Sequence, residues 1–372
     1  MKLFKFPYLV QQEILHNFEY KNLFLISFVS KNMKKLIRSS QIERFKSTNS
    51  IVYDSNEQLV CIPFKNTLDR ILQVSDRFNH YVYFKNSYFP LDVAGKIIYF
   101  RICDISRCLV AFCHPWETAI QSIHNYFLDL FGSSVEYRWR TWNQPEFFIP
   151  QLQNLSALSI SCGVKLVNLK KVQDYLSSSS PVFKRVDLRT RYLTFQNHYG
   201  LFYSLIYGDQ HTTEELFPPE SNLYQAESIG VTQRELATPA VLRHFQGRQA
   251  FIKCDMCKDQ DLIEFVNRWK SGEAFQKLEY LTIGVCFNEI SQNQILNAIG
   301  AKYIDAAKRP PRHTLPKVHI KFHGANPNTP KILSHAYVVR ESDNRVASVL
   351  IQGRIFKFGV WNKTEQEFLK MV

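Results

Sequence analysis

Cysteine pairs are the first place to look for chemistry in this sequence. Cys254 and Cys257 form a Cys-x-x-Cys pair, the spacing of zinc and thiol redox sites. A looser group comprises Cys103, Cys108, Cys113 and His114. A structural zinc site takes four ligands in two well-spaced pairs, and no second Cys-x-x-Cys is present. We expect no metal and no cofactor, and interpret the thiols as small buried hydrophobes, with zinc at Cys254 and Cys257 left open.

Motifs that would indicate an enzyme are missing from the sequence. It contains no Gly-rich phosphate loop, no Gly-x-Ser-x-Gly and no His-Glu-x-x-His. The closest acidic groups are Glu214 with Glu215, and Asp255 with Asp259 and Asp261. These carboxylates lie in predicted loops or at helix starts, where they interact favourably with the helix dipole. We expect a non-catalytic protein, although catalytic groups brought together from distant positions would escape this test.

The composition indicates a folded, basic protein. The chain has 372 residues, 45% of them hydrophobic and 14% aromatic, with a formal net charge of +13. Lysine and arginine are scattered, and their densest groups are Lys31, Lys34, Lys35 and Arg38, then Arg138 and Arg140, then Lys308, Arg309 and Arg312. Nucleic-acid-binding surfaces cluster their charge more strongly, so we do not expect direct nucleic-acid binding.

The first forty residues contain more apolar positions than a segment of that size can bury by itself. Their spacing predicts three short helices. The first begins at Pro7, the second spans Leu23 to Val29 after an N-cap at Asn22, and the third follows an N-cap at Ser30. Either the rest of the chain or another protein must therefore cover the segment.

This segment resembles an F-box domain, which we place at residues 1–45. The resemblance rests on Phe6-Pro7, Leu9-Val10, Ile14-Leu15 and the run from Leu25 to Lys31. Phe6 replaces the usual leucine and Met33 replaces a frequent tryptophan, and both remain large and apolar.

The resemblance implies docking on a Skp-type adaptor and, through it, on a cullin-based ubiquitin ligase. It implies adaptor contacts among Phe6, Pro7, Leu9, Val10, Ile14, Leu15, Leu23, Leu25, Ile26, Val29, Ser30 and Met33. Some of these side chains must instead pack the helices together, and the sequence does not divide the two groups. Because such adaptors are acidic as a family, the basic third helix is expected to help steer the encounter.

Residues 46–150 read as a mixed β-rich and helical segment. A hairpin is predicted from 51–53 to 59–62, with further strands at 81–84 and 96–102. Ser122 to Phe131 has helical periodicity, and Gly132 is placed to end that helix.

Residues 151–325 alternate predicted strands and helices. Strands are expected at 155–160, 184–188, 227–231, 251–254 and 278–283, and helices at 169–176, 236–245, 259–269 and 292–299. The alternation predicts parallel strands joined by helices, in an irregular, leucine-rich-repeat-like array. The expected fold class is thus α/β, with α+β character at both ends.

Within this array, residues 261–272 followed by 278–283 resemble the end of the F-box-associated type 2 domain of nematode F-box proteins, which would span about 215–285. Leu262, Phe265, Val266 and Trp269 share one helical stripe, so we expect Trp269 in the core. The pattern of apolar runs and turn residues predicts a C-terminal β-meander over residues 326–372. Its strands are expected at 336–339, 346–351 and 355–361, and a last helical turn at 365–369.

Two function classes follow. The favoured one is the substrate-recognition subunit of a Skp–cullin–F-box ubiquitin ligase, acting in the cytoplasm or nucleus on an unknown protein target. The alternative is a basic nucleic-acid-binding or scaffolding protein that uses the F-box as a regulatory handle. Neither class needs a membrane, and no apolar run approaches the length of a spanning helix.

Overall fold

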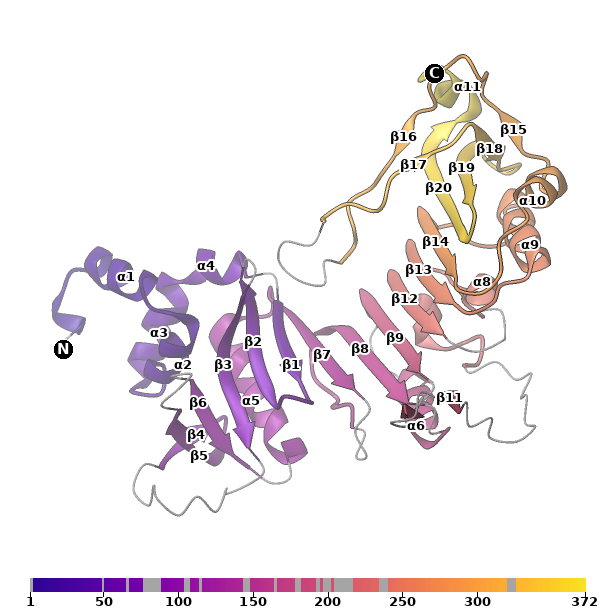
Figure 1. The fold of residues 1–372 in the computed structure, drawn as a ribbon. Helices are drawn as coiled ribbons and strands as arrows, with labels where there is room; N and C mark the ends of the chain where they lie inside the picture. The colour runs from indigo at the N-terminus through magenta and orange to yellow at the C-terminus, as the bar shows by residue number, and fades with distance from the viewer. Residues whose placement is uncertain are drawn as a thin grey trace. The chain divides into compact units, whose positions relative to one another are not determined.

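A computed structural model describes residues 3–48, 50–64, 67–75, 88–103, 108–113, 116–142, 148–163, 166–177, 182–191, 195–196, 202–203, 217–233, 240–319 and 326–372. Its contacts divide the chain into two compact units, with the boundary between Ala157 and Leu158. Both units combine helices with strands (Figure 1), so the predicted α/β class is confirmed. The leucine-rich-repeat-like detail stays a prediction.

The first unit begins with short helices. They are the 3-10 turn η1 (Leu3–Lys5) and the α-helices α1 (Tyr8–His16), α2 (Tyr20–Ile26), α3 (Lys31–Ser40) and α4 (Ile42–Lys46). The predicted cap at Ser30 is confirmed, because its side chain accepts a hydrogen bond from the Met33 N–H at 3.1 Å. The predicted cap at Asn22 is wrong. α2 starts after Glu19, whose carbonyl accepts from the Asn22 N–H, so Asn22 already lies in the first turn.

The sheet of the first unit has the strand order β7-β1-β2-β3-β6-β5-β4. Its strands are β1 (Ser50–Asp54), β2 (Leu59–Phe64), β3 (Thr67–Ser75), β4 (Phe89–Val93), β5 (Lys96–Ile102), β6 (Leu109–Phe112) and β7 (Glu136–Trp142). β1 and β2 form the predicted antiparallel hairpin, whereas β1 pairs with β7, and β3 with β6, in parallel. The strand predicted at 81–84 lies outside the described residues.

Helix α5 (Trp116–Phe131) connects β6 to β7 and begins earlier than the predicted Ser122. It ends as predicted at Gly132, which has a φ of +86° and donates its N–H to the Leu128 carbonyl. Ile123, Phe127 and Leu130 are buried along one face. This apolar face makes α5 the central helix of the first unit.

The second unit alternates strands with helices. They are β8 (Leu155–Gly163), α6 (Leu166–Ser177), β9 (Arg185–Arg191), α7 (Asn222–Gln225), β12 (Ser228–Gln233), α8 (Val241–His244), β13 (Gln249–Cys254), α9 (Asp259–Lys270), β14 (Tyr280–Val285) and α10 (Gln292–Ala298). β9, β12, β13 and β14 are parallel neighbours, as the alternation predicts. The predicted helix at 236–245 falls partly outside the described residues, and its described part is α8.

The second unit closes with short strands and a last helix. They are β15 (Lys302–Tyr303), β16 (Arg312–His313), β17 (Ile332–Leu333), β18 (Ala336–Val339), β19 (Arg345–Gln352), β20 (Ile355–Thr364) and α11 (Glu365–Leu369), with a separate pair β10 (Phe195–Gln196) and β11 (Phe202–Tyr203). β18, β19 and β20 run antiparallel, and β20 pairs with β14. In the described part of the chain, no helix has the length and apolarity to cross a bilayer.

Candidate functional site

Exposed apolar side chains gather in the first thirty residues, and we call this set the N-terminal apolar residues. It comprises Phe4, Phe6, Tyr8, Leu9, Val10 and Val29. Leu9 is 75% exposed and Val29 is 72% exposed. On α1, which carries Leu9, the polar Gln11 is buried, and its side-chain amide donates to the Phe6 carbonyl at 2.6 Å. Apolar groups outside and a polar group inside indicate a surface that another molecule covers.

The structure divides the twelve residues that the sequence grouped together. Six are exposed: Phe6, Pro7, Leu9, Val10, Val29 and Ser30. Three are partly buried: Ile14, Leu25 and Ile26. Three are buried inside the first unit: Leu15, Leu23 and Met33. The buried three hold the helices together in this structure, whereas adaptor contact by the exposed six stays a prediction.

Two exposed residues were not among the predicted contacts. Phe4 lies in η1 and Tyr8 opens α1, and about half of each side chain is exposed. Both flank the Phe6-Pro7 pair, so the apolar density of the first ten residues was the signal that could have included them.

Aromatic packing joins the N-terminal helices to α5. Phe24 stacks on Phe127 with ring centroids 4.9 Å apart, and Phe28 stacks on Tyr126 at 4.2 Å. Phe45 of α4 meets the ring of Phe131 edge-on at 4.7 Å. Such contacts contribute beyond simple burial, so the helices share a core with the rest of the first unit.

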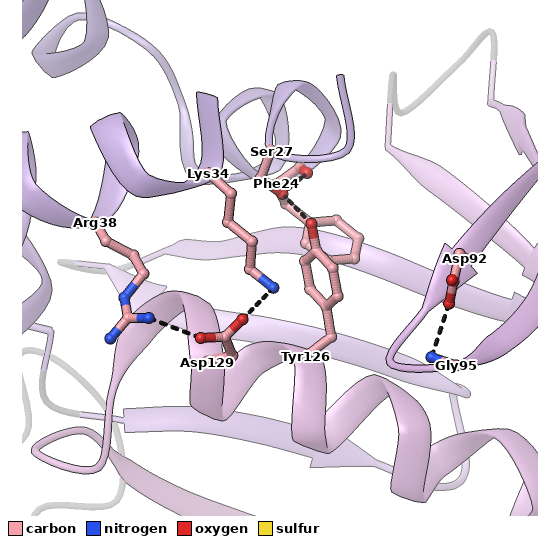
Figure 2. Close-up of polar contacts among 8 residues, drawn as sticks. All are labelled: Phe24, Ser27, Lys34, Arg38, Asp92, Gly95, Tyr126 and Asp129. Atoms are coloured by element: carbon pink, nitrogen blue, oxygen red, sulfur yellow. Dashed lines mark hydrogen bonds and ion pairs between the residues drawn. The ribbon is translucent and has the colours of Figure 1, made fainter. Parts of the chain in front are cut away.

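Polar contacts reinforce the same interface (Figure 2). The Ser27 hydroxyl donates to the Phe24 carbonyl and therefore accepts from the Tyr126 hydroxyl, at 2.8 Å. Burial raises the pKa of Tyr126 to about 12, which keeps this hydroxyl protonated as a donor. From α3, the Lys34 and Arg38 side chains both reach the Asp129 carboxylate, at 2.5 and 2.7 Å.

These ion pairs change the interpretation of the basic third helix. Helix α3 carries four basic residues, and Asp129 pairs with two of them, Lys34 and Arg38. Lys34 also lies over the Tyr126 ring. Lys31 and Lys35 are exposed, and no acidic side chain among the described residues pairs with either. The expected attraction of an acidic partner therefore stays a prediction, and it rests on Lys31 and Lys35.

Other candidates from the sequence have structural partners. Arg138 pairs with Glu136 at 3.3 Å, and Arg140 pairs with Asp54 at 3.4 Å. Both pairs neutralise charge that the nucleic-acid alternative would use.

The Cys-x-x-Cys pair is buried. Burial raises the pKa of Cys254 to about 12 and raises that of Cys257 further, so both thiols are protonated. No group of three potential metal ligands occurs within the described ranges.

Comparison with known proteins identifies the segment that carries the N-terminal apolar residues. No curated protein and no solved structure matches the chain. Residues 3–45 match the family described as the F-box domain, whose members bind Skp-type adaptors. The resemblance of residues 215–285 to the nematode type 2 domain stays a prediction. The N-terminal helices, from η1 to α4, form an F-box domain.

Proposed function

We propose that this protein is the substrate-recognition subunit of a Skp–cullin–F-box ubiquitin ligase. The observation that carries the proposal is the exposure of Leu9 and Val29 within an F-box whose Leu15, Leu23 and Met33 are buried. Covering a large aliphatic side chain contributes roughly 1.5–3 kcal/mol, so these residues are suited to anchor an adaptor.

The rest of the chain supports the receptor half of the proposal. The second unit has its own core and places a parallel sheet far along the sequence from the F-box. A receptor of this kind performs no chemistry; it raises the effective concentration of target lysines near the ligase. F-box proteins are typically such non-catalytic receptors.

The test compares two double variants of the full-length chain for binding to a purified Skp-type adaptor. Leu9→Ala with Val29→Ala removes two exposed anchors from the F-box. The matched control, Ile97→Ala with Tyr99→Ala, removes two similarly exposed apolar side chains from β5. We expect the F-box variant to weaken adaptor binding roughly a hundredfold, as the loss of two buried anchors implies.

The control variant should bind the adaptor like the unmodified chain. Equal adaptor occupancy for both double variants, measured by calorimetry on folded samples, would sink the receptor assignment. A ubiquitination assay with the reconstituted ligase then asks whether the chain brings a bound protein to the ligase.

A further inference from the structure

One face of the parallel sheet in the second unit is polar. Helices α8 and α9 lie beside the opposite face of β12, β13 and β14 (Figure 1), where alternate residues such as Ile229, Ile252 and Ile283 are buried. Parallel sheets are usually apolar and covered on both faces. A polar second face is therefore a feature that the fold itself does not require.

The strand register places the side chains of this polar face in three rows. The first row is Arg185, Ser228, Gln249 and Tyr280; the second is Asp187, Gly230, Phe251 and Thr282; the third is Arg189, Thr232, Lys253 and Gly284. Residues paired across neighbouring strands lie on the same face, so each row runs across the sheet.

The first row is covered by the chain itself. The Gln249 side chain donates to the Pro316 carbonyl at 2.8 Å and accepts from the Val318 N–H at 3.0 Å. The Tyr280 hydroxyl donates to the Pro330 carbonyl at 2.9 Å. The second and third rows border a hollow of about 210 Å³, lined by residues that include Arg189, Phe251 and Lys253.

A buried ion pair shapes one wall of this hollow. Arg185 donates to Asp187 at 2.7 Å and also to the Ser228 hydroxyl, and its guanidinium lies 5.1 Å from the Phe251 ring centroid. Gly230 provides the space, because a Cβ there would collide with both charged side chains. The pair neutralises the carboxylate of Asp187, the one acidic side chain in the three rows.

The remaining charges on this face are positive. Lys253 is exposed and Arg189 is partly exposed, and no carboxylate among the described residues pairs with either. Lys357 of β20 is the register partner of Thr282 and adds a third cation. Arg189 and Lys253 stand two strand spacings apart, roughly 10 Å, with Thr232 between them. Phe251, two residues before Lys253 on β13, offers an apolar contact in the neighbouring row.

We propose that this hollow binds an extended acidic segment of a protein target, with carboxylates at Arg189 and Lys253 and an apolar side chain against Phe251. A peptide is favoured over a nucleic acid because a few separated cations suit a few carboxylates, whereas nucleic acids need a longer run of phosphate contacts. The interpretation of this hollow as the place where a ligase target binds rests on the proposed receptor role.

The test measures fluorescence anisotropy of the full-length chain with a labelled ten-residue peptide that alternates glutamate and leucine. A peptide with glutamine in place of glutamate and a labelled ten-nucleotide oligouridine are the comparison probes. The variants are Lys253→Glu alone and Arg189→Glu with Lys253→Glu. Arg309→Glu with Lys277→Glu is the control, because it changes net charge equally at exposed positions elsewhere in this unit.

We expect the acidic peptide to bind the unmodified chain and the glutamine peptide to bind at least about tenfold more weakly. The double variant should lose roughly tenfold in affinity for the acidic peptide, Lys253→Glu less, and the control under about twofold. Equal losses in the double variant and the control overturn the site, as does an effect confined to the oligouridine.

Adaptor binding is measured on the same samples. A double variant that no longer binds the peptide but still binds the adaptor supports the site. If the unmodified chain does not bind the adaptor, the receptor role fails while the peptide result stands.

Discussion

The two units expose opposite chemistry. The F-box of the first unit presents Leu9 and Val29 to solvent, whereas the polar sheet face of the second unit presents Arg189 and Lys253. Apolar burial is not weakened by the screening that salt imposes on charges, and it suits a partner that stays bound. Separated charges favour fast, salt-sensitive encounters and suit a partner that is exchanged. The difference teaches that one chain can place an apolar and a charged surface in separate units, and the proposed adaptor and target would each meet a different one.

The strongest test of this division removes one core aromatic ring from each unit. Phe24 and Trp269 are both fully buried, Phe24 against Phe127 and Trp269 against Phe358. Phe24→Ala and Trp269→Ala should each lower the free energy of unfolding by about 3–5 kcal/mol. Hydrogen exchange followed by mass spectrometry should show faster exchange in α2 and α5 for Phe24→Ala, and in α9 and β20 for Trp269→Ala. Equal acceleration in both units by either variant would contradict the separation.

Acid should weaken the first unit through a buried histidine. His124 accepts from the Tyr53 hydroxyl and donates to the Gln153 carbonyl, and burial lowers its pKa from 6.5 to about 4. Between pH 6.5 and 4 the His124 imidazole is protonated in the unfolded chain but neutral in the folded chain. The contribution of His124 to the free energy of unfolding therefore falls as pH drops from about 6.5 to 4 and is constant above that window. The loss approaches roughly 3 kcal/mol.

Chemical denaturation between pH 4 and 8 measures this loss as the difference between the unmodified chain and His124→Gln. The variant removes the titrating ring while retaining hydrogen-bonding capacity. Buried His313 of the second unit, whose pKa is also lowered by burial, is present in both proteins and cancels. A pH dependence that is identical in the two proteins would show that His124 does not carry the effect.

A smaller effect is expected at the wall of the hollow in the second unit. Gly230→Ala places a methyl group against the Arg185–Asp187 pair, and such overpacking costs about 1–3 kcal/mol. Gly284→Ala is the matched control on the same face, because no described atom lies within 4 Å of its added methyl group. Thermal unfolding should separate the two variants, and equal midpoints would show that the pair moves aside freely.

The smallest effect is expected at Asp129 of α5, an exposed carboxylate that pairs with cations of α3. Asp129→Asn removes ion pairs to Lys34 and Arg38 and should cost less than about 1 kcal/mol, and less still in high salt. The control is Glu43→Gln, which breaks an exposed ion pair between Glu43 and Lys46 within α4. Hydrogen exchange in α3 should rise for Asp129→Asn alone; no difference between the variants would show that Asp129 does not anchor the F-box.

Local signals in the sequence predicted local structure well. The Ser30 cap, the helix end at Gly132 and the burial of Trp269 each depend on neighbours within one or two turns, and each is confirmed. The parallel strands followed from alternating periodicity. The wrong cap at Asn22 came from weighing cap propensity alone, since Glu19 ends an extended segment and accepts the first-turn N–H groups.

Three features depend on the folded arrangement and could not be predicted. Leu9 and Leu15 lie about 120° apart around α1, and because both faces carry apolar residues the periodicity does not say which face turns inward. Asp129 pairs with Arg38 across 91 positions of sequence, so no local pattern shows that the basic helix is partly neutralised. The polar sheet face likewise became visible only through the register of strands that are far apart in the chain.

The shared aromatic core also bears on how the protein is made. The F-box residues leave the ribosome before α5, which ends at Phe131 and supplies Phe127 and Phe131 as ring partners for Phe24 and Phe45. At roughly 5–20 residues per second, many seconds of synthesis separate the two segments. During that interval the nascent F-box lacks part of its interior, so its complete aromatic core forms only after the chain has grown beyond α5.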